Sequence, residues 1–265
     1  LLFSAVVQFE PPKASATALF VSYYVPLVII FSTGLLIAWW VLNRSVVESM
    51  VIGLGACFSN TVLLGIPLIP RALGNEALFP LFLIISVHGI TVFTAVTVAI
   101  EIARGRDAGL SELPQQVIRG LLANPLIVGL AAGFLWKLTG LGLHPLAKDM
   151  FDLVSTSVTP AALFVLGSSL AGYRISGSIA PAVVVSVLKN CLQPLLVFGV
   201  GYTLGLEPLW LSVAVLLAAM PTGVNMYLFA SRYDVSPPTA TTSILISTVS
   251  GIATLSLVIG LLKLI

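Results

Sequence analysis

Residues 53–67 read GLGACFSNTVLLGIP and place an asparagine, a threonine and a proline in the middle of the apolar segment 47–70. Proline lacks a backbone N–H and clashes with the preceding turn, so we expect the helix to break near Gly65–Pro67. Residues 221–225 read PTGVN within the apolar segment 209–230 and predict a second break. Irregular backbone at membrane depth is tolerated only where protein buries it or where it lines a cavity. Two such breaks at equivalent positions predict a transport site.

The rest of the chain is similarly apolar. Of its 265 residues, 58% are hydrophobic and 8% are charged, whereas a soluble domain has about 45–50% apolar and roughly 25% charged residues. This composition excludes a water-soluble globular protein and predicts an all-α, polytopic membrane helix bundle in a lipid bilayer. Eight apolar runs are each long enough to cross a bilayer with some tilt, namely 20–41, 47–70, 78–103, 118–138, 150–173, 179–205, 209–230 and 239–262.

An internal repeat organises these runs. Sliding the chain on itself by 161 residues brings the runs 47–70 and 78–103 onto the last two runs without a gap. The second half then has five spans, and because five is odd, two such halves enter the membrane from opposite sides as an inverted repeat. The first half would lack one whole span and most of another, and Leu1–Gln8 is interpreted as the remnant of a span cut by N-terminal truncation. The predicted units are an incomplete first repeat 1–104, a central loop 105–117 and a second repeat 118–265.

The charges indicate orientation and exclude one class of partner. Arg104, Arg106 and Arg119 flank the predicted central loop, and the positive-inside rule places that loop in the cytoplasm of a multi-pass cell-membrane protein. Twelve Lys and Arg against ten Asp and Glu are spread thinly along the chain. No basic face exists to neutralise a row of phosphates, so nucleic acid is not expected as a partner.

Several motifs resemble the auxin efflux carrier family, in the right order over essentially the whole chain. The sequence NTVLLGIPLI at 60–69 is similar to the fourth-helix motif of that family, and AAMPTG at 218–223 with FASRY at 229–233 is similar to its ninth helix. Asn124-Pro125 resembles the sixth helix, and TPA at 159–161 with GSSL at 167–170 resembles the seventh. The short central loop is typical of the prokaryotic branch.

The resemblance implies a ten-helix inverted repeat, five plus five, in which the fourth and ninth helices break at prolines and cross beside the substrate. It assigns Asn60, Pro67, Asn124 and Pro221 to the site. From the residues themselves we expect amide and hydroxyl groups to bind the substrate, while helix N-termini supply positive potential. The full set of candidate substrate-binding residues is Asn60, Thr61, Gly65, Pro67, Asn124, Pro221, Thr222, Gly223 and Asn225.

Two ionisable side chains are further candidates. Lys189 lies about ten residues into the run 179–205, or about 15 Å deep. It either contributes to an anion site, or is structural and caps carbonyls of a broken neighbour or reaches the interface. His88 lies in mid-span and is either a proton relay that couples transport or a hydrogen-bonded member of the bundle.

The function that fits best is a secondary carrier that moves a small organic anion by alternating access. The resemblance suggests auxin-like substrates or small mono- and dicarboxylates such as malate or malonate. No carboxylate lies between Val51 and Ile69 or between Leu209 and Ser231, so a sodium-coupled symporter of the bile-acid type would need neutral oxygen ligands. A membrane enzyme or a receptor is the other alternative, although no metal-binding or nucleophile motif is found and no cofactor or metal is expected. The oligomeric state stays open, and a homodimer is one of the states the sequence allows.

Overall fold

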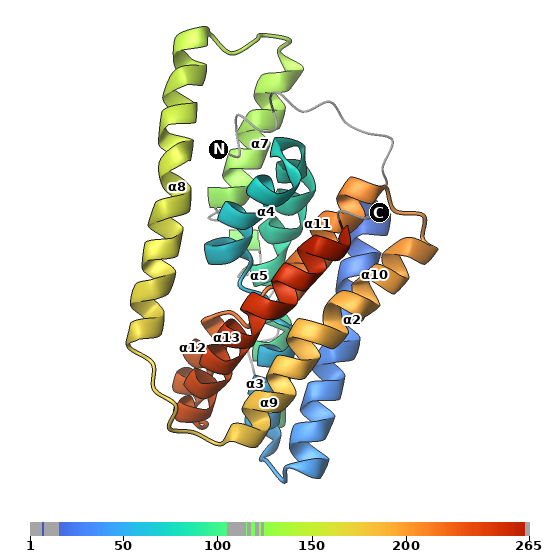
Figure 1. Ribbon diagram of the computed structural model, residues 1–265, viewed down its shortest axis with the longest axis vertical. Helices are drawn as coiled ribbons and strands as arrows, with labels where there is room; N and C mark the ends of the chain where they lie inside the picture. Colours follow the sequence, from blue (N-terminus) through green and yellow to red (C-terminus); the bar gives the residue numbers. More distant parts are fainter. Residues whose placement is uncertain are drawn as a thin grey trace.

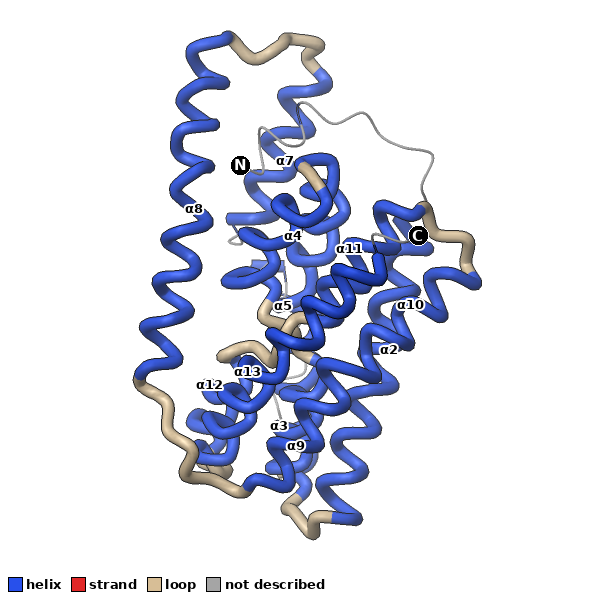
Figure 2. Tube along the Cα trace, in the orientation of Figure 1, coloured by secondary structure: helices blue, strands red, loops and turns tan. Residues whose placement is uncertain are grey.

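The computed structural model describes residues 16–104 and 125–262, together with the isolated positions 7, 115, 118, 119 and 122. The described residues form a bundle of helices with no strand among them (Figures 1 and 2). The predicted all-α membrane bundle is therefore confirmed. Asn124, the Leu1–Gln8 segment apart from Val7, and the predicted central loop apart from position 115 lie outside the described residues.

Five of the described helices are long and apolar enough to cross a membrane, and a shorter helix, α7, covers the described part of the run that begins at 118. The ends of the five long helices agree with the predicted runs to within about five residues. These helices are α2 (Ala16–Leu36) with the π-helical η1 (Ile37–Val41), η3 (Asn75–Ala77) with α5 (Leu78–Ala103), α8 (Pro145–Ala171), α9 (Ile179–Val187) with the π-helical η4 (Leu188–Leu192) and α10 (Gln193–Thr203), and α13 (Pro237–Leu262), with α7 at Pro125–Leu138.

The two remaining runs form helices that are each interrupted, as predicted. In the first, a non-helical segment at Phe58–Asn60 separates the two halves, and in the second a segment at Met220–Val224 does so. The halves are α3 (Val46–Cys57) and η2 (Thr61–Gly65) with α4 (Ile66–Leu73) in the first run, and α11 (Pro208–Ala219) and α12 (Asn225–Tyr233) in the second.

The second break includes Pro221 and Gly223 as expected, but the predicted position of the first break was wrong. The chain is helical through Gly65 and Pro67, and the break lies several residues earlier. Pro67 is accommodated at the start of α4, directly after the π-helical turn η2. A wider turn of this kind relaxes the constraint that a missing N–H imposes on a regular α-helix, so the helix does not need to end at this proline.

The core of the bundle lies around the first halves of the broken helices. Nearly every residue from Leu211 to Met220 in and after α11 is buried, as is most of α3. The helix α2 packs closely on α3 through Gly53, where an added Cβ would come within 2.8 Å of the Phe31 carbonyl oxygen. The helix α8 runs along one side of the molecule (Figure 1), and among its residues only Leu166 is buried. Exposed apolar side chains on such helices are expected, since they face lipid.

Basic residues gather at one end of the bundle. Arg44, just before α3, donates to Ser178 Oγ at 3.0 Å, and Arg104, at the end of α5, donates to the Tyr233 carbonyl at 2.6 Å. The guanidinium groups of Arg104 and Arg232 lie over the Tyr233 ring, at 4.9 and 5.5 Å from its centroid. Arg44, Arg104 and Arg232 therefore lie at the same end of the bundle.

Candidate functional site

The two broken helices cross at their non-helical segments. Asn60 N donates to Pro221 O at 2.9 Å and Gly223 N donates to Phe58 O at 3.0 Å, and these bonds form an isolated antiparallel bridge between Ser59 and Thr222. Each unwound segment thus satisfies backbone groups of the other, which is the condition for irregular backbone at membrane depth. Pro221 has no backbone N–H, so its backbone can only accept hydrogen bonds, and its carbonyl oxygen accepts one here.

Small and rigid residues allow the crossing to be this close. A Cβ on Gly223 would lie 2.9 Å from the Phe58 ring, and one on Gly65 would lie 3.1 Å from the Leu217 side chain. Pro221 packs against Gly251 of α13. Gly65, Gly223 and Pro221, which the sequence predicted as site residues, therefore shape the crossing through their backbone and small size. Their side chains contain no polar group that could bind a ligand.

Side chains from other elements cap the first halves of both helices. Lys189 Nζ, in η4, donates to the carbonyl of Ala218 in α11. Gln193 Nε2, one turn further along, donates to the carbonyl of Cys57, the last residue of α3, at 3.1 Å. The hydroxyl of Thr222 donates to the carbonyl of Gly55 in α3. These carbonyls have no partner within their own helix, because the last turn of a helix leaves its acceptors free.

This geometry gives Lys189 the capping interaction that the sequence offered as one of two interpretations. Its side chain is fully buried and ends on a carbonyl in the core, so it does not reach the membrane interface. Thr222 was expected to offer its hydroxyl to a substrate, but the hydroxyl proton is already donated within the crossing. The backbone N–H of Thr222 donates to Ser247 Oγ at 3.0 Å, so α13 also supports the second break.

The second halves of the broken helices begin with polar side chains that have no hydrogen-bond partner among the described residues. Asn60 and Thr61 stand at the start of η2 and are only 6% and 3% exposed, and Asn225 is the first residue of α12. In the part of the chain that the structure describes, none of these three side chains makes a hydrogen bond. Buried polar groups are almost always hydrogen-bonded, and helix N-termini attract anions. These three side chains are therefore the candidates at the crossing for binding a polar, anionic ligand.

His88 of α5 adds a further unpartnered group beside the first break. Its ring is 1% exposed, stacks on Phe58 at a centroid distance of 4.6 Å, and meets Tyr23 edge-on at 5.5 Å. The Tyr23 hydroxyl donates to Ser59 Oγ at 3.4 Å. Neither nitrogen of His88 has a hydrogen-bond partner among the described residues. The hydrogen-bonded histidine that the sequence allowed as one interpretation is thus not seen among the described residues. Through its contact with Phe58, His88 lies next to the crossing.

Two supporting residues were not found from the sequence. Gln193 caps α3, and Asn190 holds α13 through bonds from its Nδ2 to Ser247 O at 2.8 Å and Ser250 Oγ at 2.9 Å. Both follow Lys189 on the same span, and their polarity within a strongly apolar run was the available signal. Asn124 lies outside the described residues, so its place relative to the crossing is not defined.

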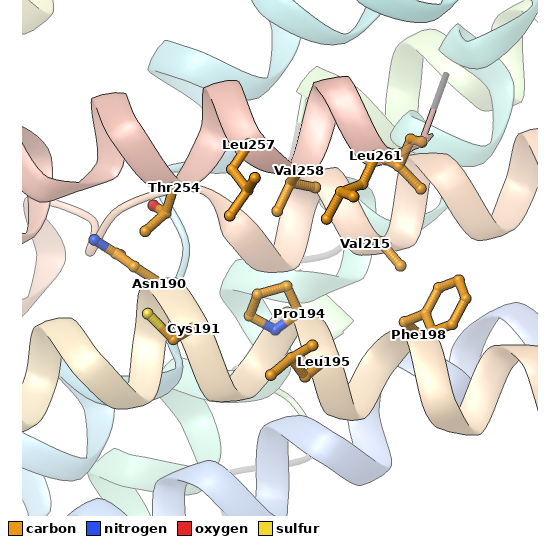
Figure 3. A pocket seen from close by; sticks show the side chains of 11 residues that line it. Asn190, Cys191, Pro194, Leu195, Phe198, Val215, Thr254, Leu257, Val258 and Leu261 are labelled. Atoms are coloured by element: carbon orange, nitrogen blue, oxygen red, sulfur yellow. The ribbon is translucent and has the colours of Figure 1, made fainter. Parts of the chain in front are cut away.

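A separate groove of about 440 Å³ lies between α10, α11 and α13 (Figure 3). It is lined mainly by apolar side chains, among them Pro194, Phe198, Val215 and Leu257. The amide of Asn190 borders it, but both amide hydrogens are used in the bonds to α13. Apart from the weakly donating thiol of Cys191, the described side chains of the groove therefore offer no spare donor for an anion.

Comparison with known proteins agrees with this architecture. A model of the family described as "Membrane transport protein" matches residues 1–259. A Rhizobium meliloti (strain 1021) protein described as "Putative malonate transporter" is 29% identical over 275 residues, which cover 100% of this chain and 82% of that protein. Auxin efflux carrier component 8 of Arabidopsis thaliana is 28% identical over 55% of this chain and 41% of its own length. An uncharacterized transporter of Methanothermobacter thermautotrophicus is 25% identical over 85% of this chain and 72% of its own length. The chain therefore belongs to the membrane transport protein family, which includes the auxin efflux carriers that its motifs resemble, and it is a transporter rather than an enzyme.

Proposed function

We propose that this protein is a secondary carrier of small organic anions, with its substrate bound at the helix crossing and exposed to each side of the membrane in turn. The observation that carries the proposal is the pair Asn60 and Thr61, which are buried, begin a half-helix and have no side-chain partner in the described structure. Two half-helix N-termini, at Thr61 and Asn225, supply positive potential without a buried cation at the ligand.

Small dicarboxylates such as malonate are the substrate class that we favour. The full-length similarity to the Rhizobium meliloti protein supports a malonate-like substrate, and the auxin carrier similarity covers a smaller part of the chain. His88 would donate a hydrogen bond to a substrate carboxylate, because a neutral imidazole has one N–H to give. Hydrogen bonds to charged groups are the strong ones.

Flux into proteoliposomes tests this function. Purified protein should catalyse saturable uptake of labelled malonate, which unlabelled malonate and malate inhibit and the neutral analogue malonamide does not. Empty liposomes give the background rate. A protein that is folded by its melting profile but takes up no mono- or dicarboxylate, auxin-like acids included, would contradict the proposal and favour a receptor.

We also propose that the two inverted repeats, 1–104 and 118–265, are joined by a loop at 105–117 that lies in the cytoplasm. The cluster of Arg44, Arg104 and Arg232 at one end of the bundle supports that orientation through the positive-inside rule. A cysteine introduced by Gly109→Cys, in a protein whose Cys57 and Cys191 are replaced by alanine, should resist impermeant thiol reagents in intact cells.

The matched control for this topology experiment is Leu141→Cys in the same background. Leu141 is exposed and lies between α7 and α8, at the opposite end of α8 from Arg174. It should react readily from outside. The reverse pattern, with Gly109→Cys labelled and Leu141→Cys protected, would reverse the orientation.

A further inference from the structure

Lys189 is fully buried in the membrane-spanning part of the protein, and it forms no ion pair with a described carboxylate. Among the described residues the one ion pair is Arg44 with Glu48, at the end of the bundle. No carboxylate occurs in either crossing segment. The Lys189 ammonium instead donates to Ala218, in the last turn of α11.

The same short stretch of chain also reaches the other half-helix. Gln193, four residues after Lys189, caps the last residue of α3, and both η4 side chains Lys189 and Asn190 are buried where η4 packs on α3, α11 and α13. The C-termini of α3 and α11 therefore converge on one face of the α9–η4–α10 span. The crossing thus has its negative helix ends toward η4, while its positive helix ends begin at Thr61 and Asn225.

The charges on this face balance. A helix C-terminus is equivalent to about half a negative charge, so the two C-termini together carry about one negative charge, and one ammonium neutralises them. In many secondary transporters the carbonyls of half-helix C-termini coordinate a coupling Na⁺. Here the same kind of carbonyl accepts a hydrogen bond from a lysine.

We propose that the Lys189 ammonium takes the place of a coupling cation at the crossing, so that transport does not require sodium. This inference rests on the proposed function, because it concerns how the same crossing binds its anion. The tethered charge keeps the half-helix C-termini neutralised in every state of the cycle. A sodium-coupled mechanism of the bile-acid type would need a free ion to do this.

The test replaces Lys189 with alanine, which removes the ammonium and leaves space in which a sodium ion could bind. We expect the wild-type protein to transport malonate at the same rate in sodium, potassium and choline salts, and its melting temperature in detergent to be the same in all three. Lys189→Ala should lose transport in choline by about tenfold or more, as expected when about 1.4 kcal/mol of binding is lost. Sodium should restore part of that rate and raise the melting temperature of this variant by about 3 °C or more, since a bound ion stabilises the folded state.

Two control variants separate the loss of the Lys189 charge from the opening of a space for sodium and from the general effect of removing a lysine. Lys189→Met removes the charge but fills the space, so it should be impaired without any response to sodium. Lys148→Ala removes an exposed lysine of α8 and should behave as wild type in every salt. Lys189→Ser, which adds a hydroxyl ligand for sodium, replaces the alanine variant if that variant does not fold in choline.

Either of two results would overturn the inference. One is a sodium requirement, or a sodium-induced rise in melting temperature, in the wild-type protein. The other is the absence of any sodium response in both Lys189→Ala and Lys189→Ser, in folded yield, melting temperature and flux alike. Because the melting measurements need no substrate, they decide this question even if malonate proves not to be transported, which would contradict the proposed function alone.

Discussion

Replacing Asn60 with alanine should weaken binding of malonate by roughly 5- to 150-fold, the equivalent of about 1–3 kcal/mol. The asparagine is buried at the start of η2, and its amide makes no hydrogen bond within the described structure. Its donors are therefore available to a carboxylate at a helix N-terminus, and their removal leaves that carboxylate partly unpaired. Isothermal titration or the concentration dependence of a thermal shift measures the change in affinity.

Asn75→Ala is the matched control, because Asn75 is exposed in η3 and lies outside the crossing. Its affinity for malonate should equal that of the wild type. Because the Asn60 amide makes no hydrogen bond with the described residues, Asn60→Ala should not lower the melting temperature in the absence of ligand. Unchanged affinity in a folded Asn60→Ala protein would remove the substrate from the crossing.

The fold could be predicted from the sequence because the membrane imposes it. Six apolar runs became continuous helices and two became pairs of half-helices, since backbone groups in lipid must be satisfied within the protein. The second break was also found, because Pro221 and Gly223 are both difficult to place in a helix interior. The physical constraint was strong and local in these cases.

The first break shows where a local rule failed. Pro67 suggested a break, but a π-helical turn absorbs it, and the break occurs at Phe58–Asn60. The repeat register was the better guide, because a shift of 161 residues carries Phe58–Asn60 onto 219–221, at the start of the second break. Two segments that hydrogen-bond each other must unwind at matching places, whichever of them contains the proline.

The capping side chains could not be predicted in the same way. Gln193 caps a residue 136 positions earlier in the chain, and the pairing depends on how two spans pack in three dimensions. Lys189 could be recognised as unusual from its depth, but its partner, the carbonyl of Ala218, has no signature in the sequence. The lack of a hydrogen-bond partner for Asn60 and His88 among the described residues likewise depends on their surroundings rather than on their residue type.

Replacing His88 with phenylalanine should raise the stability of the protein while it impairs transport. A buried polar group without a partner destabilises a fold by about 1–3 kcal/mol, and the phenylalanine ring can keep the stacking contact with Phe58. Relief of that penalty should raise the melting temperature of the ligand-free protein by about 2–4 °C for each kcal/mol regained. Loss of a hydrogen bond to a substrate carboxylate should lower malonate affinity roughly 10- to 150-fold.

The opposite signs of these two effects separate a functional histidine from a structural one. A histidine that held the bundle together would lower both stability and transport when replaced, and a histidine with no role would leave the affinity for malonate unchanged. His88→Leu, which is closer to histidine in volume, checks that any loss does not come from overpacking between Phe58 and Tyr23. His144→Asn, at the N-cap of α8, changes the other histidine but keeps a capping side chain and should alter neither quantity. If His88→Phe melts lower than the wild type and binds malonate as tightly, then His88 does not contact the substrate, and its unpaired nitrogens require another explanation.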